Sequence, residues 1–266
     1  MPDPRELVTD MYLQFAEELA DAAGEAIRPW FRSDLDVERK GDGSPVTQAD
    51  RAAETAIRER ICSRYPSHGI VGEEFGSDQD DAEWVWVIDP IDGTGAFISG
   101  LPTFGTLIGL VRDGAPVLGV LDQPILAERW TGVSFPDLPL RATHNSQVVH
   151  TSTTGDLGES IGFASDPTMF EAEEQGAWNR LASSLYRARY GIDCYAYGLL
   201  ASGFVDIVCE ASLKAWDYMA LVPIVRGAGG QMTDWAGDQL TQGSGDQVLA
   251  SASHTLHRAA LTRLCG

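Results

Sequence analysis

The sequence of 266 residues predicts a mixed α/β fold that joins an α+β half to an α/β half. In the first half, up to about residue 138, helical periodicity is followed by apolar runs joined by turn signals, as in helices packed on an antiparallel sheet. In the second half, 139–266, helical and strand patterns alternate. Apolar residues make up 44% and charged residues 22%, which is an ordinary globular composition. We therefore expect a single unit made of two packed halves.

Charge and cysteine spacing exclude several classes of function. The net charge of −20 and the pI of about 4.4 argue against nucleic acid and anionic membrane as partners. An anionic ligand would need a bound cation to reverse the sign locally. The four cysteines form no CxxC pair, so we expect reduced thiols in a cytoplasmic protein. Neither a signal peptide nor an apolar run of about 18 residues is apparent.

The chain opens with two expected helices. Apolar residues recur at helical spacing from the first residues to a stop near Pro29. The polar stretch 33–44 reads as a loop, and its Lys40 has an ordinary explanation as a solvated lysine. Thr47 is expected to cap the second helix, because Asp50 three residues on completes a capping box. This cap gives Asp50 a structural explanation that needs no catalytic role.

The central feature of the first half is an apolar strand that ends in two acids, Asp89 and Asp92. A hairpin through the acidic loop 77–83 would place Glu73 beside this strand end. Carboxylates held together repel one another unless a cation lies between them, and hard divalent cations prefer oxygen ligands. The alternative is a strand-end turn with solvated acids.

Two features follow this strand. Gly93 and Thr94 stand where a short helix begins, and backbone N–H groups at a helix start favour an anion. Residues 103–111 and 116–121 then read as sheet strands, joined by a turn at Asp113 and Gly114.

The second half begins after the weakly patterned stretch 141–160. Asp193 precedes an expected helix, for which it has an ordinary explanation as a cap, and Glu210 ends an expected strand. Asp217 opens another helix, where the helix dipole alone explains an acid. The expected elements are helices at 171–186, 196–202, 215–227 and 253–264 and strands at 205–209 and 231–234.

Four motifs resemble those of the inositol monophosphatase family of metal-dependent sugar phosphatases. The resemblance covers about residues 7–250 and departs from the family pattern at Gly95 and Ala96, where a polar or basic residue is frequent. The motifs are 86–94 (WVIDPIDGT) with Phe97, Trp216 and Asp217 with Ala220 and 227–230 (GAGG), 72–74 (GEE), and 45–50 (PVTQAD).

This resemblance implies the layered αβαβα sandwich of that family, a homodimer, and hydrolysis of a small phosphomonoester that depends on Mg²⁺. It also implies the metal ligands. Glu73, Asp89 and the carbonyl of Ile91 would hold a first Mg²⁺, and Asp89, Asp92 and Asp217 a second. Glu73 would also serve a weaker third ion. Four carboxylates repel a phosphate, and two or three Mg²⁺ would reverse that sign.

The resemblance assigns catalysis and phosphate binding to neighbouring residues. Thr94, oriented by Asp50, would position and deprotonate the attacking water, with Glu73 also in the catalytic set. The backbone amides of Gly93 and Thr94 would receive the phosphate.

The substrate's alcohol part falls to Asp92, Asp193 and Glu210, and Lys40 to a loop that closes over the site. Within the family the chain is most similar to the histidinol-phosphate phosphatase branch. Alternatives are an inositol, polyol or sugar monophosphatase, and an inactive paralogue that only binds metal and sugar phosphate. The branch motifs are 97–102 (FISGLP) with 104–108 (FGTLI), 193–197 (DCYAY), and Leu213 with Lys214.

Overall fold

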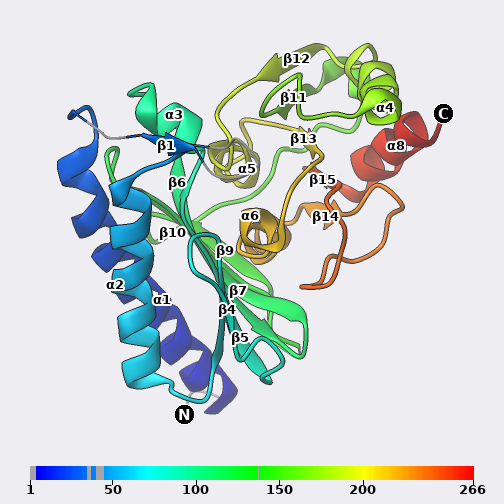
Figure 1. Ribbon diagram of the computed structural model, residues 1–266. Coiled ribbons are helices and arrows are strands. Elements are labelled where there is room, and N and C mark those ends of the chain that lie inside the picture. The colour runs from blue at the N-terminus through cyan, green and yellow to red at the C-terminus, as the bar shows by residue number, and fades with distance from the viewer. Residues whose placement is uncertain (1–3, 35–36, 40–44, 137) are drawn as a thin grey trace.

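The computed structural model describes residues 4–34, 37–39, 45–136 and 138–266. Two β-sheets alternate with three groups of helices, so that the fold has five layers (Figure 1). This is the αβαβα sandwich that the family resemblance implies. In the described ranges, no helix has both the length and the apolar character needed to cross a bilayer.

The first sheet has eight strands and a parallel pair near one edge. Strand β3 (Gly69–Gly72) runs parallel to β5 (Trp84–Asp92), with Gly72 opposite Ile88. The expected hairpin is therefore wrong, because β4 (Gly76–Asp78) pairs with β3 and the chain then crosses back. Since the ends of parallel strands meet at one edge of a sheet, the segment after β3 still lies beside the end of β5. The spatial order continues from β5 through β6 (Gly105–Arg112), β7 (Ala115–Gln123), β8 (Glu128–Val133) and β9 (Arg141–His144) to β10 (Gln147–Val148).

The hairpin between β6 and β7 confirms the expected turn. Asp113 and Gly114 both have positive φ, 49° and 80°, as a two-residue turn between twisted strands requires. The same sheet extends to Val148, past the boundary expected near residue 138. That both halves form one catalytic unit stays a prediction.

The second sheet has five strands of mixed direction. Strand β11 (Ile161–Ala164) is parallel to both of its neighbours, whereas β15 (Val248–Ser251) is antiparallel to both of its own. The sequence predicts β13 and β14, but not the other three strands. In spatial order the strands are β12 (Arg187–Tyr190), β11 (Ile161–Ala164), β13 (Ile207–Glu210), β15 (Val248–Ser251) and β14 (Gln231–Thr233).

The helices fill the three remaining layers. Helices α1 and α2 cover the outer face of the first sheet, α5 to α7 lie between the sheets, and α4 and α8 cover the far side (Figure 1). The helix expected at 215–227 is in fact two helices, and the one expected at 171–186 ends at Ala182. Their bounds are α1 (Pro4–Ile27), α2 (Gln48–Arg64), α3 (Thr94–Ile98), α4 (Ala172–Ala182), α5 (Tyr195–Ala201), α6 (Ala215–Tyr218), α7 (Leu221–Gly227) and α8 (His254–Cys265), with 3₁₀ turns η1 (Arg28–Trp30) and η2 (Leu157–Glu159).

A small third sheet corrects the loop expected at 33–44. Strand β1 (Glu38–Arg39) pairs antiparallel with β2 (Pro45–Val46) immediately before α2. Lys40 lies outside the described residues.

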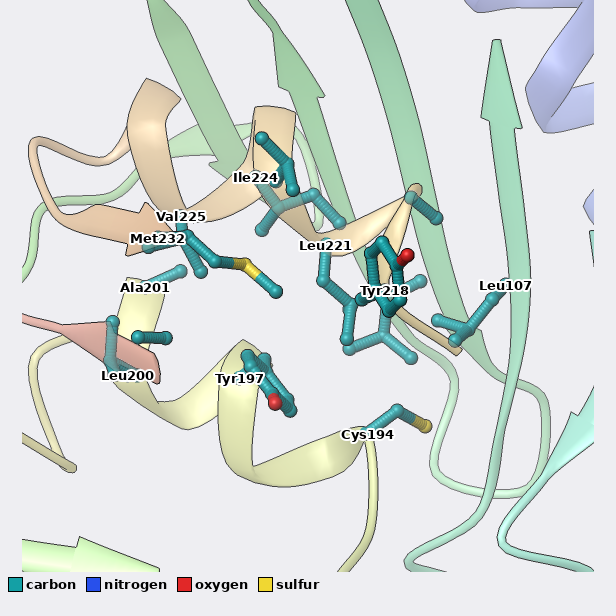
Figure 2. Packing of buried hydrophobic residues seen from close by; sticks show 14 of the residues in the cluster. Leu107, Cys194, Tyr197, Leu200, Ala201, Tyr218, Leu221, Ile224, Val225 and Met232 are labelled. Carbon is teal, nitrogen blue, oxygen red and sulfur yellow. The ribbon is translucent and has the colours of Figure 1, made fainter. Parts of the chain in front are cut away.

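The core between the two sheets draws on both halves of the chain. Figure 2 shows Tyr197 and Leu200 of α5 lying with Tyr218 of α6, Leu221 of α7 and Leu107 of β6. All five side chains are buried. This shared core fixes α6 against the first sheet.

Glycines on β7 and β8 let the middle helices approach the sheet closely. A Cβ at Gly119 would overlap the carbonyl oxygen of Ala220 and stand 2.7 Å from its carbonyl carbon. A Cβ at Gly132 would likewise overlap the backbone of Ile224. Only glycine permits such contact between two backbones. The contact seats α7 on the first sheet, and α6, which contains Asp217 and ends two residues before Ala220, lies against β5.

Candidate active site

Asp89 lies at the centre of the site because β5 is irregular at its end. The pairing with β6 shifts register between Asp89 and Asp92, and such a bulge re-aims side chains. Asp89 is only 2% exposed. Its Oδ1 accepts a hydrogen bond from the backbone N–H of Ile91 at 2.9 Å, which fixes the carboxylate over the turn.

Three carboxylates meet at this point. Asp89, Asp92 and Asp217 each offer an oxygen, and these atoms all lie within 4.8 Å of one another. Backbone donors orient two of them. The N–H of Cys194 donates to Oδ2 of Asp92 at 2.8 Å, and the N–H of Lys214 donates to Oδ2 of Asp217 at 2.6 Å.

The electrostatics of the cluster favour a cation. Burial, followed by the charges of Glu73, Asp92 and Asp217, raises the pKa of Asp89 well above its ordinary value. Burial also raises the pKa of Asp92, and that of Asp217 to about 7. A divalent cation would remove this repulsion, and buried carboxylate oxygens are the ligands that hard cations prefer. The donor set therefore fits a metal ion.

Glu73, the residue that follows β3, adjoins this cluster. Its backbone N–H donates to the carbonyl of Ile88 at 3.3 Å, one residue before Asp89. Its carboxylate raises the pKa of both Asp89 and Asp217. The parallel pairing of β3 with β5 thus brings Glu73 to the place where the sequence expects it, by a different connection.

Thr94 faces two acceptors. Its Oγ1 lies 3.4 Å from Oδ1 of Asp50 and 3.1 Å from the carbonyl oxygen of Ile91. Since a hydroxyl has one proton, these are alternative acceptors. The other oxygen of Asp50 accepts from the backbone N–H of Thr47 at 2.8 Å and from its hydroxyl at 2.6 Å. The capping box is therefore confirmed, and the same fully buried carboxylate also reaches Thr94.

Gly93 carries the turn between β5 and α3. Its φ of 82° is left-handed, which glycine adopts without strain. A Cβ at this position would stand 2.8 Å from Oδ2 of Asp193, so this carboxylate lies directly against the glycine. Phosphate binding by the amides of Gly93 and Thr94 stays a prediction.

Asp193 and Glu210 form a second acidic pair beside the metal-type cluster. Burial, and next the charge of Glu210, raises the pKa of Asp193 to about 7. Glu210 is 3% exposed and accepts hydrogen bonds from the hydroxyls of Ser165 and Tyr197, the latter at 2.8 Å. The explanation of Asp193 as a helix cap is wrong, because Cys194 is the N-cap of α5 and no side chain caps that helix.

Sequence reasoning missed the groups that orient these acids. The backbone N–H of Cys194 donates a hydrogen bond to Asp92, 102 residues away in the sequence, and the hydroxyls of Ser165 and Tyr197 donate to Glu210. A backbone donor leaves no signal in a sequence, and a single serine or tyrosine leaves little.

Comparison with known proteins decides the family. The profile of the inositol monophosphatase family matches residues 9–265. The chain belongs to the inositol monophosphatase family. The family consists of phosphatases that act on small phosphomonoesters and use metal ions, and the buried acidic cluster of this member is suited to hold them.

Individual relatives carry two different names. The chain is 46% identical over 228 residues to the bifunctional phosphatase IMPL2 of Arabidopsis thaliana, covering 85% of this chain and 65% of that protein. It therefore spans somewhat less than two thirds of this relative's length. It is 36% identical to the histidinol-phosphatase of Mycobacterium tuberculosis, over 83% of this chain and 86% of that protein.

A solved structure is also similar. An inositol monophosphatase from Zymomonas mobilis is 44% identical and superimposes with a TM-score of 0.88, covering 97% of this chain and 98% of that one. Membership of the family confirms the resemblance predicted from the four motifs.

Proposed function

We propose that this protein is a Mg²⁺-dependent phosphomonoesterase whose main substrate is L-histidinol phosphate, as in histidine biosynthesis. Glu73, Asp89, Asp92, Asp217 and the carbonyl of Ile91 would hold two or three Mg²⁺. The convergence of Asp89, Asp92 and Asp217 within 4.8 Å supports this ligand set. Bound Mg²⁺ supplies positive charge that attracts the phosphate and stabilises the charge that develops during displacement.

Thr94 and Asp50 prepare the attacking water. Oγ1 of Thr94 accepts a hydrogen bond from the water and donates its own proton towards Oδ1 of Asp50, and these two side-chain oxygens are 3.4 Å apart. Burial raises the pKa of Asp50, which makes this carboxylate a better proton acceptor than an exposed one. The amides of Gly93 and Thr94 orient the phosphate towards this water.

The acidic pair beside Gly93 carries the choice of substrate. Histidinol phosphate has an ammonium group and an imidazole near its phosphate, whereas an inositol phosphate offers only hydroxyls. The carboxylate of Asp193 lies against Gly93, where the phosphate is proposed to sit, and Glu210 raises its pKa. A cationic alcohol bound there would relieve that repulsion. The names of histidinol-phosphatase relatives support the same substrate.

A polyol substrate is the second candidate. The 44% identical Zymomonas structure is an inositol monophosphatase, which favours inositol 1-phosphate or another sugar phosphate. An inactive paralogue that binds metal and sugar phosphate is the third candidate, and the full set of acids argues against it.

The decisive experiment compares kcat/KM for histidinol phosphate, inositol 1-phosphate and fructose 1,6-bisphosphate side by side. We expect histidinol phosphate to be preferred. Asp193→Asn should raise KM for histidinol phosphate about ten- to hundredfold, since a hydrogen bond to a charged group contributes about 1.5–3 kcal/mol, and leave KM for inositol 1-phosphate unchanged. Asp238→Asn, at an exposed acid, is the control. Preference for inositol 1-phosphate in the wild type would overturn the substrate, and binding without turnover would support the inactive paralogue.

Assembly and location are part of the same proposal. Family resemblance supports a homodimer, which sedimentation of the purified protein tests directly. Cys62, Cys194, Cys209 and Cys265 are free thiols, which supports a reducing compartment such as the cytoplasm.

A further inference from the structure

Glu54 is a buried acid that takes no part in the steps above. It lies on α2, one helical turn after Asp50, and its exposed fraction is 0%. A carboxylate without contact to water is costly unless hydrogen bonds and a cation compensate it. Its partners therefore show what it holds in place.

Within the part of the chain that the structure describes, Glu54 forms its hydrogen bonds with its own helix and with the turn after β3. Its Oε2 accepts from the backbone N–H of Glu74 at 2.8 Å, and its Oε1 accepts from the N–H of Phe75 at 3.2 Å. Arg58, four residues on, donates to Oε1 through Nε at 2.8 Å. A second nitrogen of Arg58 donates to the carbonyl of Gly76. The side chains of Glu54 and Arg58 thus form hydrogen bonds with the backbone of three consecutive residues, 74–76.

Gly72 lies next to these hydrogen bonds and has no room for a side chain. A Cβ at Gly72 would overlap Oε1 of Glu54 and stand 2.7 Å from its Cδ, so only glycine fits between the acid and β3. On its other side, the N–H of Glu73 bonds the carbonyl of Ile88 in β5. Glu73 is therefore held between β5 and the Glu54–Arg58 pair of α2.

We propose that Glu54, braced by Arg58, is a positioning residue that sets the affinity of the site for divalent cations by fixing the turn that carries Glu73. This inference rests on the proposed role of Glu73 as a metal ligand. It makes α2 the common support of both parts of the site: Asp50 reaches Thr94, and Glu54 reaches the backbone next to Glu73.

The physical reason is the free-energy cost of ordering the turn that carries Glu73. Gly76 has a φ of 71°, and β4, into which the turn leads, is an exposed edge strand of three residues, so the turn lies at the margin of the sheet. If the turn is loosened, binding of a cation must also order Glu73, and that cost lowers affinity. Once the cation is bound, the ligands occupy the same positions, so turnover should change little.

Glu54→Gln tests this inference. The glutamine amide has the shape of the carboxylate, but its NH₂ group would face a backbone N–H that now donates to Glu54, so one hydrogen bond is lost. Binding of Mg²⁺ alone is measured by isothermal titration calorimetry, together with the shift in Tm that Mg²⁺ produces. We expect the Kd for Mg²⁺ to rise about tenfold, equal to about 1.4 kcal/mol, with kcat at saturating Mg²⁺ within about twofold of wild type. Glu59→Gln, at an exposed acid of the same helix, should leave the Kd unchanged.

Arg58→Lys is a second variant. It keeps the positive charge, but its single ammonium group cannot bind both Glu54 and the carbonyl of Gly76 as the guanidinium does. This variant tests the inference if Glu54→Gln does not fold. A Kd equal to wild type in the folded variants overturns the inference. So does loss of kcat at saturating Mg²⁺ with an unchanged Kd. Absence of Mg²⁺ binding in the wild type itself contradicts the proposed function instead, so the two failures are distinguishable.

Discussion

We expect the free energy of unfolding to depend on pH and on Mg²⁺, because the charge of Asp217 in the acidic cluster depends on both. Burial comes first among the causes that raise the pKa of Asp217 from its ordinary 3.8 to about 7. Without metal, the folded protein therefore keeps a proton on Asp217 that the unfolded chain releases near pH 4. Because the folded state binds more protons in that window, the free energy of unfolding falls as pH rises from about 4 to about 7.

Asp217→Asn removes this ionisation. Without metal, the variant should therefore be more stable than wild type, whereas most substitutions of buried residues lower stability. Each pKa unit is worth about 1.4 kcal/mol, so the gap between 3.8 and about 7 corresponds to at most about 4 kcal/mol. In chelator at pH 8, we expect the variant to be more stable than wild type by up to that amount. At about 2 °C per kcal/mol, Tm should rise by up to about 8 °C. At pH 4 the difference should vanish.

Excess Mg²⁺ should narrow the stability difference between the variant and wild type. A cation at a hundred times its Kd stabilises the wild type by about 2.7 kcal/mol, and the variant has lost a proposed ligand. Urea unfolding at pH 4 and pH 8, each with chelator and with Mg²⁺, measures all four conditions. Asp238→Asn, at an exposed acid, should show neither effect. The reasoning fails if Asp217→Asn gives no stabilisation at pH 8 in chelator, or if Mg²⁺ stabilises the variant as much as wild type.

Three further predictions concern activity and packing. Asp89→Asn should abolish most turnover, as chelator should in the wild type; full activity in excess chelator would contradict the metal requirement. Thr94→Ala should lower kcat by roughly two orders of magnitude while calorimetry still detects Mg²⁺ binding, and equal loss of both would make Thr94 structural. Gly119→Ala should lower the free energy of unfolding by about 1–3 kcal/mol or more, because its Cβ overlaps the backbone of Ala220. Gly155→Ala, where a Cβ meets nothing within 4 Å, is the matched control, and equal stability of the two variants would refute the packing argument.

Features that depend on neighbouring residues could be predicted from the sequence. The capping box joins Thr47 to Asp50, three positions later, and the turn at Asp113 and Gly114 has two residues. The strand that ends at Asp92 is predicted by its own apolar run. In each case the deciding interaction is local, so the residues that make it stand together in the sequence.

Some predictions held by a different route. Glu73 does adjoin Asp89, but through a parallel pairing of β3 with β5 rather than a hairpin. A short apolar strand carries no information about the direction of its partner. That choice follows from β4 occupying the other edge of β3.

Only the tertiary structure decided the roles of the isolated acids. In the sequence Asp217 is a first-turn acid of a helix and Asp193 a plausible cap; in the fold, Asp217 meets Asp89, and Asp193 lies against Gly93. The role of Glu54 could not be predicted, because its partners other than Arg58 are backbone N–H groups about twenty residues away. The sequence by itself determined the family motifs and the local turns and caps. Burial and distance between remote residues, which set the pKa values and orient the carboxylates, exist only once the two sheets have packed around α5, α6 and α7.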